Sequence, residues 1–345
     1  MKLQLGKVLY DKNSHEKLRP ASVTKLMSLL LIMEALDSGK ISLTDKVPCS
    51  ENASSMGGSQ IWLDARETLT VDEMLKAICV VSANDCTVAM AEYLAGSEDV
   101  FVQLMNDRAK ELNMNDTCFK NCHGIDEDGH FTSANDISIM ARELLLNHPS
   151  ITKYTTIWMD SLRDGKSELV NTNKLVRNYQ GCTGLKTGST SLALYNLAAS
   201  ATRDDLSLIA VILRAPTTKD RFSDAKTLLD YGFTNYKFAK TAEKDQVVTE
   251  CEISKGSEKS LELVYEKSSG ILVKKSSSTD VTQEIVLNEN ITAPIKKGEI
   301  LGTVHFYLDN ELLDSVNLIA KNDVKKLSFL SMYSYVIGKW INLLR

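Results

Sequence analysis

The order of apolar and polar positions predicts two kinds of structure along the chain. After Pro20, apolar residues recur three and four positions apart, which is the period of a helix packed on a core; they are Leu26, Leu29, Leu30 and Met33. Helical patterns continue to about residue 148 and include residues 71–81 and 100–112. A β-prone strand over residues 6–10 and a turn at residues 11–13 are predicted to precede this helical part.

The pattern changes after about residue 171. Residues 194–201 and 206–213 are apolar runs separated by a turn-like segment, which predicts two paired strands of a central sheet, followed by a helix over 221–231. A linker is predicted at residues 240–244. Beyond it, short β-prone runs alternate with polar turns and predict a small all-β module; these runs are residues 247–253, 261–265, 283–287, 300–308 and 315–319.

The C-terminal stretch, residues 321–345, predicts an amphipathic helix with a basic polar face. Its apolar positions follow the helical period; they are Phe329, Tyr333, Val336, Ile337, Trp340, Ile341 and Leu344. Because basic amphipathic helices with Trp and Tyr on the apolar side suit the membrane–water interface, we expect residues 323–345 to bind a membrane surface. The alternative is a helix docked on its own protein or on a second copy.

Composition narrows the possible functions. With 43% hydrophobic and 25% charged residues, the chain is in the ordinary globular range. A net charge of −5 argues against a chain-wide basic surface, so we expect no nucleic-acid partner. Seven cysteines spread over the chain do not suggest a disulfide framework. The five histidines are scattered, so we expect no metal site and no Ser/His/Asp triad.

The first candidate for chemistry is the motif Ser22-Val-Thr-Lys25. At helical geometry, residues i and i+3 lie on one face, roughly 4.5 Å apart along the axis. A neutral Lys25 amine could therefore accept the hydroxyl proton of Ser22 and create a nucleophile without any histidine. The start of a helix would also place backbone N–H groups near the reacting carbonyl. By itself this motif occurs by chance in many chains.

Two more motifs follow. Ser82-Ala-Asn84 offers a hydroxyl that can relay a proton and an amide that can hold a peptide carbonyl, or else it is a helix cap. Residues 184–188, Gly-Leu-Lys-Thr-Gly, lead into the predicted sheet. On an edge strand, Lys186 and Thr187 would offer a cation and a hydroxyl beside a groove where an extended peptide could pair. The alternative is an ordinary glycine turn.

In this order, S-x-x-K, S-x-N and K-T-G form a set found in penicillin-binding proteins and β-lactamases. The chain resembles the low-molecular-weight penicillin-binding proteins that are D-alanyl-D-alanine carboxypeptidases, serine peptidases of the S11 type. The resemblance covers nearly the whole chain; besides the β-module and terminal helix, the segments that carry it are residues 6–10, 18–25, 121–124, 129–133, 171–173, 184–190 and 195–201.

The resemblance implies a role for each matching catalytic residue. Ser22 would be the acylated nucleophile and Lys25 its general base. Ser82 would shuttle a proton toward the leaving amine, and Asn84 would contact the substrate backbone. Burial and the like charge of Lys186 would lower the pKa of Lys25 from its usual value of about 10.4.

Substrate binding is implied in the same way. Lys186 and Thr187 would anchor the terminal carboxylate, beside Gly188 and with Arg221 nearby. The backbone N–H groups of Ser22 and Ser189 would form the oxyanion hole. Two positions depart from the family pattern: Leu194, where members often have Gly, and Thr172, where some relatives carry Arg in the middle of Asn-x-Asn. Part of the substrate pocket would therefore differ.

The resemblance also implies fold and location. We expect an α/β serine transpeptidase-like catalytic domain over residues 1–240, with a five-stranded antiparallel sheet and a helical half around the groove. An all-β domain over residues 245–320 and the membrane-surface helix over residues 323–345 would follow. The location would be extracytoplasmic, on the outer face of the cytoplasmic membrane, with a signal peptide removed and the first strand entered partway.

The expected activity is removal of the terminal D-alanine from peptidoglycan pentapeptide stems through a Ser22 acyl-enzyme, with β-lactams as covalent inhibitors and no cofactor. An endopeptidase acting on peptide cross-links would use the same machinery. A β-lactamase is disfavoured, because residues 168–171, the nearest match to a deacylating Glu loop, have the wrong spacing. A catalytically silent wall-binding scaffold would not need the full motif set.

Overall fold

The computed structural model divides into two compact units, Met1–Thr234 and Asn235–Arg345. It describes the chain except for residues 4, 277–280, 309, 329–332, 334–336 and 338–345. The sequence placed the first boundary at residue 240. The structure divides earlier because β8 (Tyr236–Ala242) pairs with β11 (Ser269–Lys274) of the second unit. The expected linker at residues 240–244 therefore begins inside a strand.

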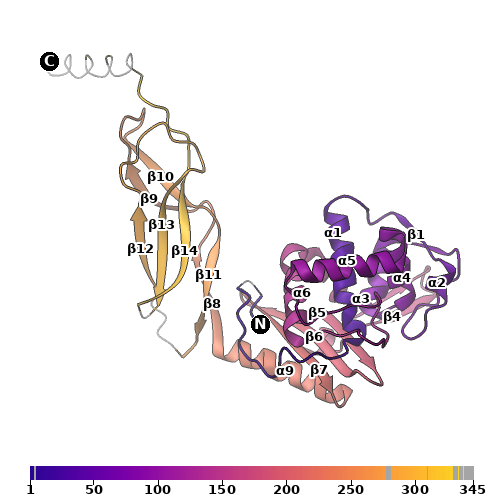
Figure 1. Ribbon diagram of the computed structural model, residues 1–345. Coiled ribbons are helices and arrows are strands. Elements are labelled where there is room, and N and C mark those ends of the chain that lie inside the picture. Colours follow the sequence, from indigo (N-terminus) through magenta and orange to yellow (C-terminus); the bar gives the residue numbers. More distant parts are fainter. Residues whose placement is uncertain (4, 277–280, 309, 329–332, 334–336, 338–345) are drawn as a thin grey trace. The chain divides into compact units, whose positions relative to one another are not determined.

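The first unit combines a helical part with an antiparallel sheet (Figure 1). Its strands are β1 (Lys46–Pro48), β2 (Thr68–Thr70), β3 (Met159–Leu162), β4 (Ser167–Val170), β5 (Cys182–Thr190), β6 (Leu194–Arg203) and β7 (Leu206–Ala215). Its helices are η1 (Ala21–Thr24), α1 (Lys25–Asp37), α2 (Glu51–Ser54), α3 (Val71–Val80), α4 (Asn84–Ala95), α5 (Glu98–Glu111), α6 (Ala134–Asn147), η2 (Pro149–Ile151), α7 (Thr152–Thr155), α8 (Leu175–Asn178) and α9 (Thr218–Asn235).

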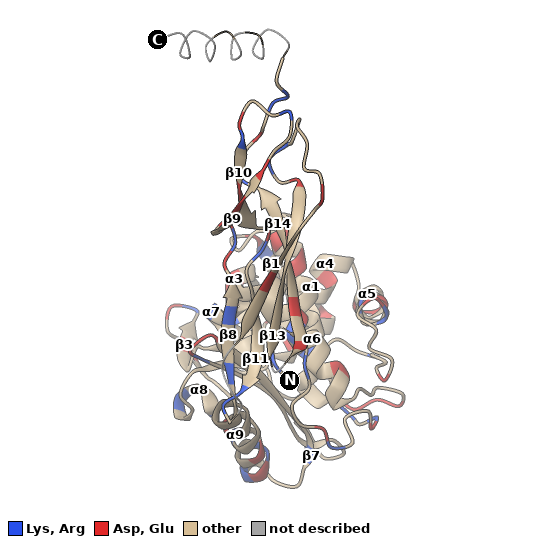
Figure 2. Cartoon of the chain, turned by 90° about the vertical axis from the view of Figure 1, so that its left-hand side faces the viewer, with Lys and Arg blue, Asp and Glu red and all other residues tan. Residues whose placement is uncertain are grey.

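Local sequence explains where these helices begin and which faces they bury. A capping box starts α3, because the Thr70 hydroxyl accepts from the Glu73 N–H while the Glu73 carboxylate accepts from the Thr70 N–H. Helix α1 is apolar nearly all round and lies inside the core. Helix α9 buries Arg221 on the same face as Ala225 and Leu229, while residues of both charge signs mark its remaining surface (Figure 2).

The central sheet has the order β5-β6-β7 and is antiparallel throughout. Residues 206–210 of β7 are all buried, so both faces of the strand are covered there. Helix α6 contacts β7, and Gly232 of α9 approaches the Leu208 side chain closely. The mixed α/β class is as expected. The described central sheet has three strands where we expected five, and the five-stranded antiparallel sheet lies in the second unit.

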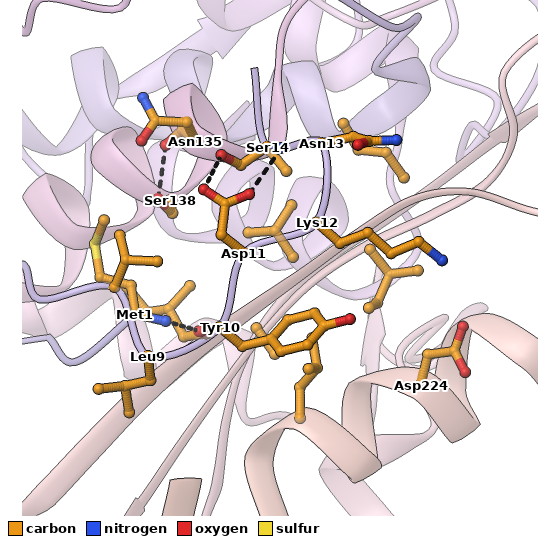
Figure 3. Close-up of a pocket in the computed structure, with 18 of the residues that line it drawn as sticks. Met1, Leu9, Tyr10, Asp11, Lys12, Asn13, Ser14, Asn135, Ser138 and Asp224 are labelled. Carbon is orange, nitrogen blue, oxygen red and sulfur yellow. Dashed lines mark hydrogen bonds between the residues drawn. The ribbon is translucent and has the colours of Figure 1, made fainter. Parts of the chain in front are cut away.

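The N-terminal segment extends the central sheet by a short pairing rather than by a full strand. The outer edge of β7 is paired by Met1–Leu3, through two hydrogen bonds between Met1 and Ile209 and one from the Leu3 N–H to Ser207. A turn follows, so the described residues 6–10 form no strand, contrary to the sequence-based expectation. Residues 8–14 instead line a cavity of about 680 Å³ against β7 and α9 (Figure 3).

The second unit is built from strands, as the hairpin spacing predicts. Its remaining strands are β9 (Val247–Glu252), β10 (Ser260–Tyr265), β12 (Thr282–Leu287), β13 (Ile300–Leu308) and β14 (Glu311–Ala320). They form one antiparallel sheet in the order β12-β13-β14-β10-β9, while β8 and β11 form a separate pair. Leu263, Val304 and Leu318 are fully buried in the core of this unit.

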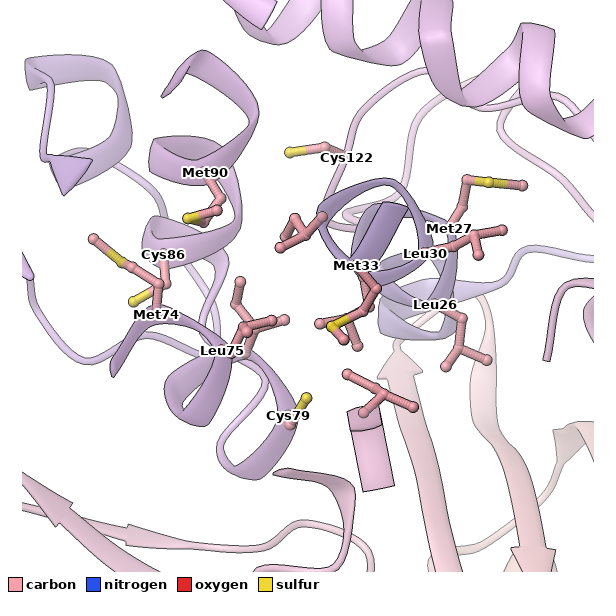
Figure 4. Packing of buried hydrophobic residues seen from close by; sticks show 14 of the residues in the cluster. Leu26, Met27, Leu30, Met33, Met74, Leu75, Cys79, Cys86, Met90 and Cys122 are labelled. Carbon is pink, nitrogen blue, oxygen red and sulfur yellow. The ribbon is translucent and has the colours of Figure 1, made fainter. Parts of the chain in front are cut away.

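Sulfur-containing side chains occupy much of the core of the first unit. Cys79, Cys86 and Cys122 are buried among methionines and leucines of α1, α3 and α4 (Figure 4). All seven cysteines are free thiols, as the absence of a framework pattern predicted. Burial raises the pKa of Cys79 to about 12 and that of Cys86 well above the ordinary thiol value. These thiols are packing residues.

The expected amphipathic helix over residues 323–345 falls mainly on residues outside those that the structure describes. Within the described residues, no helix combines the length and the apolar character needed to cross a bilayer.

Candidate functional site

Ser22 and Lys25 lie where a short 3-10 turn passes into helix α1. Side chains at i and i+3 eclipse in a 3-10 turn, so this junction aligns them more closely than an α-helix would. The Lys25 Nζ lies 3.0 Å from the Ser22 Oγ. It also lies 2.6 Å from the Asn84 Oδ1 and 2.6 Å from the His123 carbonyl oxygen. The expected contact between the two residues is confirmed.

The environment of the buried Lys25 amine favours its neutral form, which can act as a base. Its side chain is completely buried, and desolvation, followed by the nearby charge of Lys186, lowers its pKa well below the usual value. A neutral amine has two N–H groups and one lone pair. If both N–H groups donate to Asn84 and His123, the lone pair faces the Ser22 Oγ. The geometry therefore allows Lys25 to accept the hydroxyl proton.

Strand β5 lies directly against this turn. A Cβ added at Gly188 would be 2.8 Å from the Ser22 N and 2.9 Å from the Pro20 carbonyl oxygen. The absence of a side chain at residue 188 is therefore a condition for the approach of the strand to the nucleophile. Ser189, the next residue, is exposed at the end of β5. The exposed end of β5 thus follows directly on the point where the strand meets the Ser22 backbone.

The Ser82–Asn84 motif lies in a turn between α3 and α4. Ser82 has a positive φ of 68° and is nearly buried, and its Oγ makes no hydrogen bond among the described residues. Asn84 begins α4, and its Nδ2 donates to the Gly57 carbonyl at 2.7 Å while its Oδ1 accepts from Lys25. The amide is therefore fixed in one orientation. Ser82 therefore lies in the turn that follows α3, and Asn84 is the first residue of α4.

Two cations and one hydroxyl are contributed by β5 and α9; they belong to Lys186, Arg221 and Thr187. Lys186 is 1% exposed, and desolvation lowers its pKa to about 7. Its Nζ donates to the Thr187 carbonyl at 3.0 Å. Arg221 donates to the carbonyls of Gly188 and Asn196, both at 3.2 Å, and its Nε makes no hydrogen bond within the described part of the chain. Such a cluster suits an anionic ligand.

A loop that received no role in our sequence interpretation completes the site. The Asn121 Oδ1 accepts from the Gly124 N–H at 2.7 Å, which holds the loop in a tight turn. The His123 carbonyl of this turn then accepts from Lys25. The motif Asn-Cys-His-Gly marked this loop in the sequence. The acceptor, however, is a main-chain oxygen, which every residue has, so the residue types could not identify it.

The nearby histidines are neutral. Desolvation lowers the pKa of His123 to about 3 and that of His130 to about 4. The Nδ1 of His130 accepts from the Lys120 N–H, so its Nε2 donates to the Thr24 hydroxyl. Neither ring is in a protonation state that serves as an acid near neutral pH. Among the described residues, no group of three or more His, Cys, Asp or Glu side chains could hold a metal ion.

Comparisons with known proteins cover both units. The D-alanyl-D-alanine carboxypeptidase family model, Peptidase S11, matches residues 1–217, and the model of the penicillin-binding protein 5 C-terminal domain matches residues 236–326. D-alanyl-D-alanine carboxypeptidase DacF of Bacillus subtilis is 48% identical over 339 residues, covering 97% of this chain and 87% of the relative. The Escherichia coli carboxypeptidase DacC is 31% identical over 97% of this chain and 86% of its own.

Solved structures agree with these matches. Penicillin-binding protein 5 from Haemophilus influenzae superposes with a TM-score of 0.80 at 32% identity, covering 94% of this chain and 96% of that chain. Penicillin-binding protein D2 from Listeria monocytogenes in its ampicillin-bound form superposes with a TM-score of 0.62 at 29% identity, covering 67% and 94%. With its serine and lysine in contact beside a K-T-G strand, the chain belongs to the S11 family of D-alanyl-D-alanine carboxypeptidases.

Proposed function

We propose that this protein is a serine-type D-Ala-D-Ala carboxypeptidase that removes the terminal D-alanine of peptidoglycan pentapeptide stems. The observation that carries the proposal is the fully buried Lys25 amine, 3.0 Å from the Ser22 Oγ and with a lowered pKa. This pair can generate a serine nucleophile near neutral pH, where the neighbouring histidines are neutral.

This geometry supports the following order of steps for acylation. Lys25 takes the Ser22 proton as the Oγ attacks the carbonyl carbon of the penultimate D-alanine. The backbone N–H groups of Ser22 and Ser189 stabilise the oxyanion. The peptide C–N bond then breaks, and the proton passes from Lys25 to the leaving amine, with Ser82 as the relay. Water deprotonated by Lys25 attacks the ester, and the stem is released with Ser22 restored.

The remaining residues would bind the substrate. Lys186, Thr187 and Arg221 would anchor the terminal carboxylate, because a cation pair and a hydroxyl there complement an anion. Gly188 would let the stem peptide approach the strand closely, and Asn84 would contact its backbone. A β-lactam carries a comparable acyl group and carboxylate, so it would acylate Ser22 covalently. The Listeria relative has been solved with ampicillin bound.

The direct test is D-alanine release from a diacyl-L-Lys-D-Ala-D-Ala peptide by the intact chain and by Ser22→Ala. Ser55→Ala, at an exposed serine, is the matched control. We expect release from the intact chain and the control, and none from Ser22→Ala. No release from the intact chain, although penicillin still acylates its Ser22, would favour the endopeptidase, which would then be assayed on cross-linked dimeric peptides.

Location is a separate part of the proposal. We propose that the protein works outside the cytoplasm, where its substrate lies, and that residues 323–345 hold it at the outer face of the cytoplasmic membrane. The basic amphipathic sequence pattern supports this anchor. Deleting residues 323–345 should abolish sedimentation with anionic phospholipid vesicles. Sedimentation that is unchanged by the deletion would refute the anchor and leave the enzymatic proposal intact.

A further inference from the structure

Thr172 connects the two sides of the site. Its N–H donates to the Val80 carbonyl at 3.1 Å, just before the Ser82 turn. Its Oγ1 lies 2.7 Å from the Thr187 Oγ1 on β5. One residue therefore contacts both the end of α3 and the strand that carries Lys186.

The neighbours of Thr172 hold its main chain in place. Asn171 donates through Nδ2 to the Ile157 carbonyl at 2.7 Å, and its Oδ1 accepts from the Asn173 N–H at 2.8 Å. Asn171 and Asn173 are 4% and 1% exposed, whereas Thr172 is half-buried. The two buried asparagines thus present the Thr172 hydroxyl to Thr187 at a fixed position.

The direction of the hydrogen bond between the two hydroxyls depends on what Thr187 meets. In the free protein, either hydroxyl can donate to the other. An anion beside Thr187 can only accept, so it requires the Thr187 proton. The Thr187 Oγ1 then accepts a hydrogen bond from the Thr172 hydroxyl, and the two hydrogen bonds polarise one another in the same direction. The result is a chain of donors from Thr172 through Thr187 to the anion.

We propose that Thr172 is a positioning residue for carboxylate recognition, acting through the hydroxyl of Thr187. This inference rests on the proposed function, which places the substrate carboxylate at Thr187. It adds that discrimination between a free carboxylate and an uncharged terminus depends on a residue that does not touch the ligand. Thr172 is therefore a specificity-determining residue of the pocket.

The test compares two ligands that differ only in this group, benzylpenicillin and its methyl ester. The second-order rate constant of Ser22 acylation is measured for the intact chain and for Thr172→Ala, Thr172→Val and Thr172→Ser. Loss of the hydroxyl should slow acylation by benzylpenicillin about tenfold, the scale of one hydrogen bond in a chain to a charged group. The ester carbonyl also accepts from Thr187, but a hydrogen bond to a neutral acceptor is roughly half as strong as one to a charged acceptor. The methyl ester should therefore be slowed by only about threefold or less, and Thr172→Ser should restore the difference.

A double-mutant cycle separates positioning from general damage. In a Thr187→Ala background, Thr172→Ala should have no further effect on benzylpenicillin, because the relay is already broken. Equal slowing of both ligands, or additive effects in the cycle, would overturn the inference. The proposed function is judged independently, since it fails when the unsubstituted chain releases no D-alanine. Ala and Val both remove the hydroxyl, so either carries the test should the other fail to fold.

Discussion

Gly124 packs so tightly on Ala21 that a Cβ at residue 124 would overlap the Ala21 carbonyl group. Gly124 also has a positive φ of 92°, which L side chains rarely adopt. The loop that supplies the His123 carbonyl to Lys25 therefore depends on a missing side chain directly beside the nucleophile turn.

Gly124→Ala should destabilise the first unit and abolish the acylation of Ser22 by benzylpenicillin, because the loop that supplies the His123 carbonyl can no longer pack on Ala21. The matched control is Gly39→Ala, which has a positive φ of 72° but meets no atom within 4 Å of the added Cβ. In the control, the strained backbone alone should lower the free energy of unfolding by roughly 1 kcal/mol. Gly124→Ala should lower it by a further amount of about 1–3 kcal/mol, because the new methyl group overpacks the site. Thermal unfolding and benzylpenicillin labelling measure both effects. Equal losses in the two variants would contradict this explanation.

Asp85 holds the loop that receives Asn84. Its buried carboxylate accepts from the N–H groups of Ile61 and Leu63, each at 3.1 Å. Both bonds end on Oδ2, while Oδ1 accepts from the Cys86 N–H at 2.9 Å. Asp85→Asn replaces one of these two oxygens by a donor, so at least one buried N–H loses its partner in either orientation of the amide. We expect a loss of roughly 3 kcal/mol in the free energy of unfolding, measured with urea and Trp fluorescence.

The control for Asp85 is Asp64→Asn, an exposed carboxylate in the same segment. It should change the free energy of unfolding by less than about 0.5 kcal/mol. If Asp85→Asn proved as mild as this control, the two backbone hydrogen bonds would not hold the loop.

Acylation should depend on pH in a bell shape set by two lysines. Lys25 must be neutral to act as a base, so the rate constant falls as acid protonates it. The pKa of Lys186 is lowered to about 7, so this residue is charged below that pH and neutral above it. Carboxylate binding therefore weakens as the pH rises through 7. The second-order acylation constants report on the free protein and should show both limbs for benzylpenicillin.

Two features of the profile check the assignment. Benzylpenicillin methyl ester should keep the acid limb and lose most of the alkaline limb, because it has no carboxylate to anchor. The pKa values of His123 and His130 lie at about 3 and 4, so neither ring produces a step near pH 6.5. An alkaline limb of equal size for both ligands would remove Lys186 from the carboxylate site.

Lys25→Ala removes the amine that donates to the Asn84 Oδ1 and the His123 carbonyl and faces the Ser22 Oγ at 3.0 Å. Loss of a general base should slow acylation by about 10²–10⁴-fold. Intact-mass spectrometry of the penicillin adduct over time measures the rate. Lys76→Ala, at a partly exposed lysine paired with Asp72 on α3, is the control and should acylate normally. A rate for Lys25→Ala close to the control would assign the base elsewhere.

The sequence predicted the helices and strands whose apolar residues follow a clear helical period or a continuous apolar run. The helical periods at residues 71–81 and 221–231 and the apolar runs at residues 194–201 and 206–213 appear as α3, α9, β6 and β7. The strand expected at residues 6–10 is absent from the described structure, because Met1–Leu3 takes the pairing edge of β7. Which of two neighbouring segments pairs with the edge of a sheet depends on the tertiary structure, and the β-propensity of one segment does not show it.

The site divides in a similar way. The contact between Ser22 and Lys25 follows from a three-residue spacing, so the sequence predicts it directly. The hydroxyl pair joins Thr172, in the segment between β4 and α8, to Thr187 on β5. The His123 carbonyl is a main-chain group. Contacts of these two kinds require the folded backbone, which is why the sequence pointed to the loop without assigning it a role.

The free thiols lie at different depths in the two units, so their rates of chemical modification report on local unfolding. In an excess of an alkylating reagent, Cys118 and Cys182, which are partly exposed, should be modified first. Cys79, Cys86 and Cys122 are labelled only when the core around α1 opens, and Cys251 reports on the second unit alone. Mass spectrometry of the labelled chain would therefore time the opening of each unit separately, without any introduced probe.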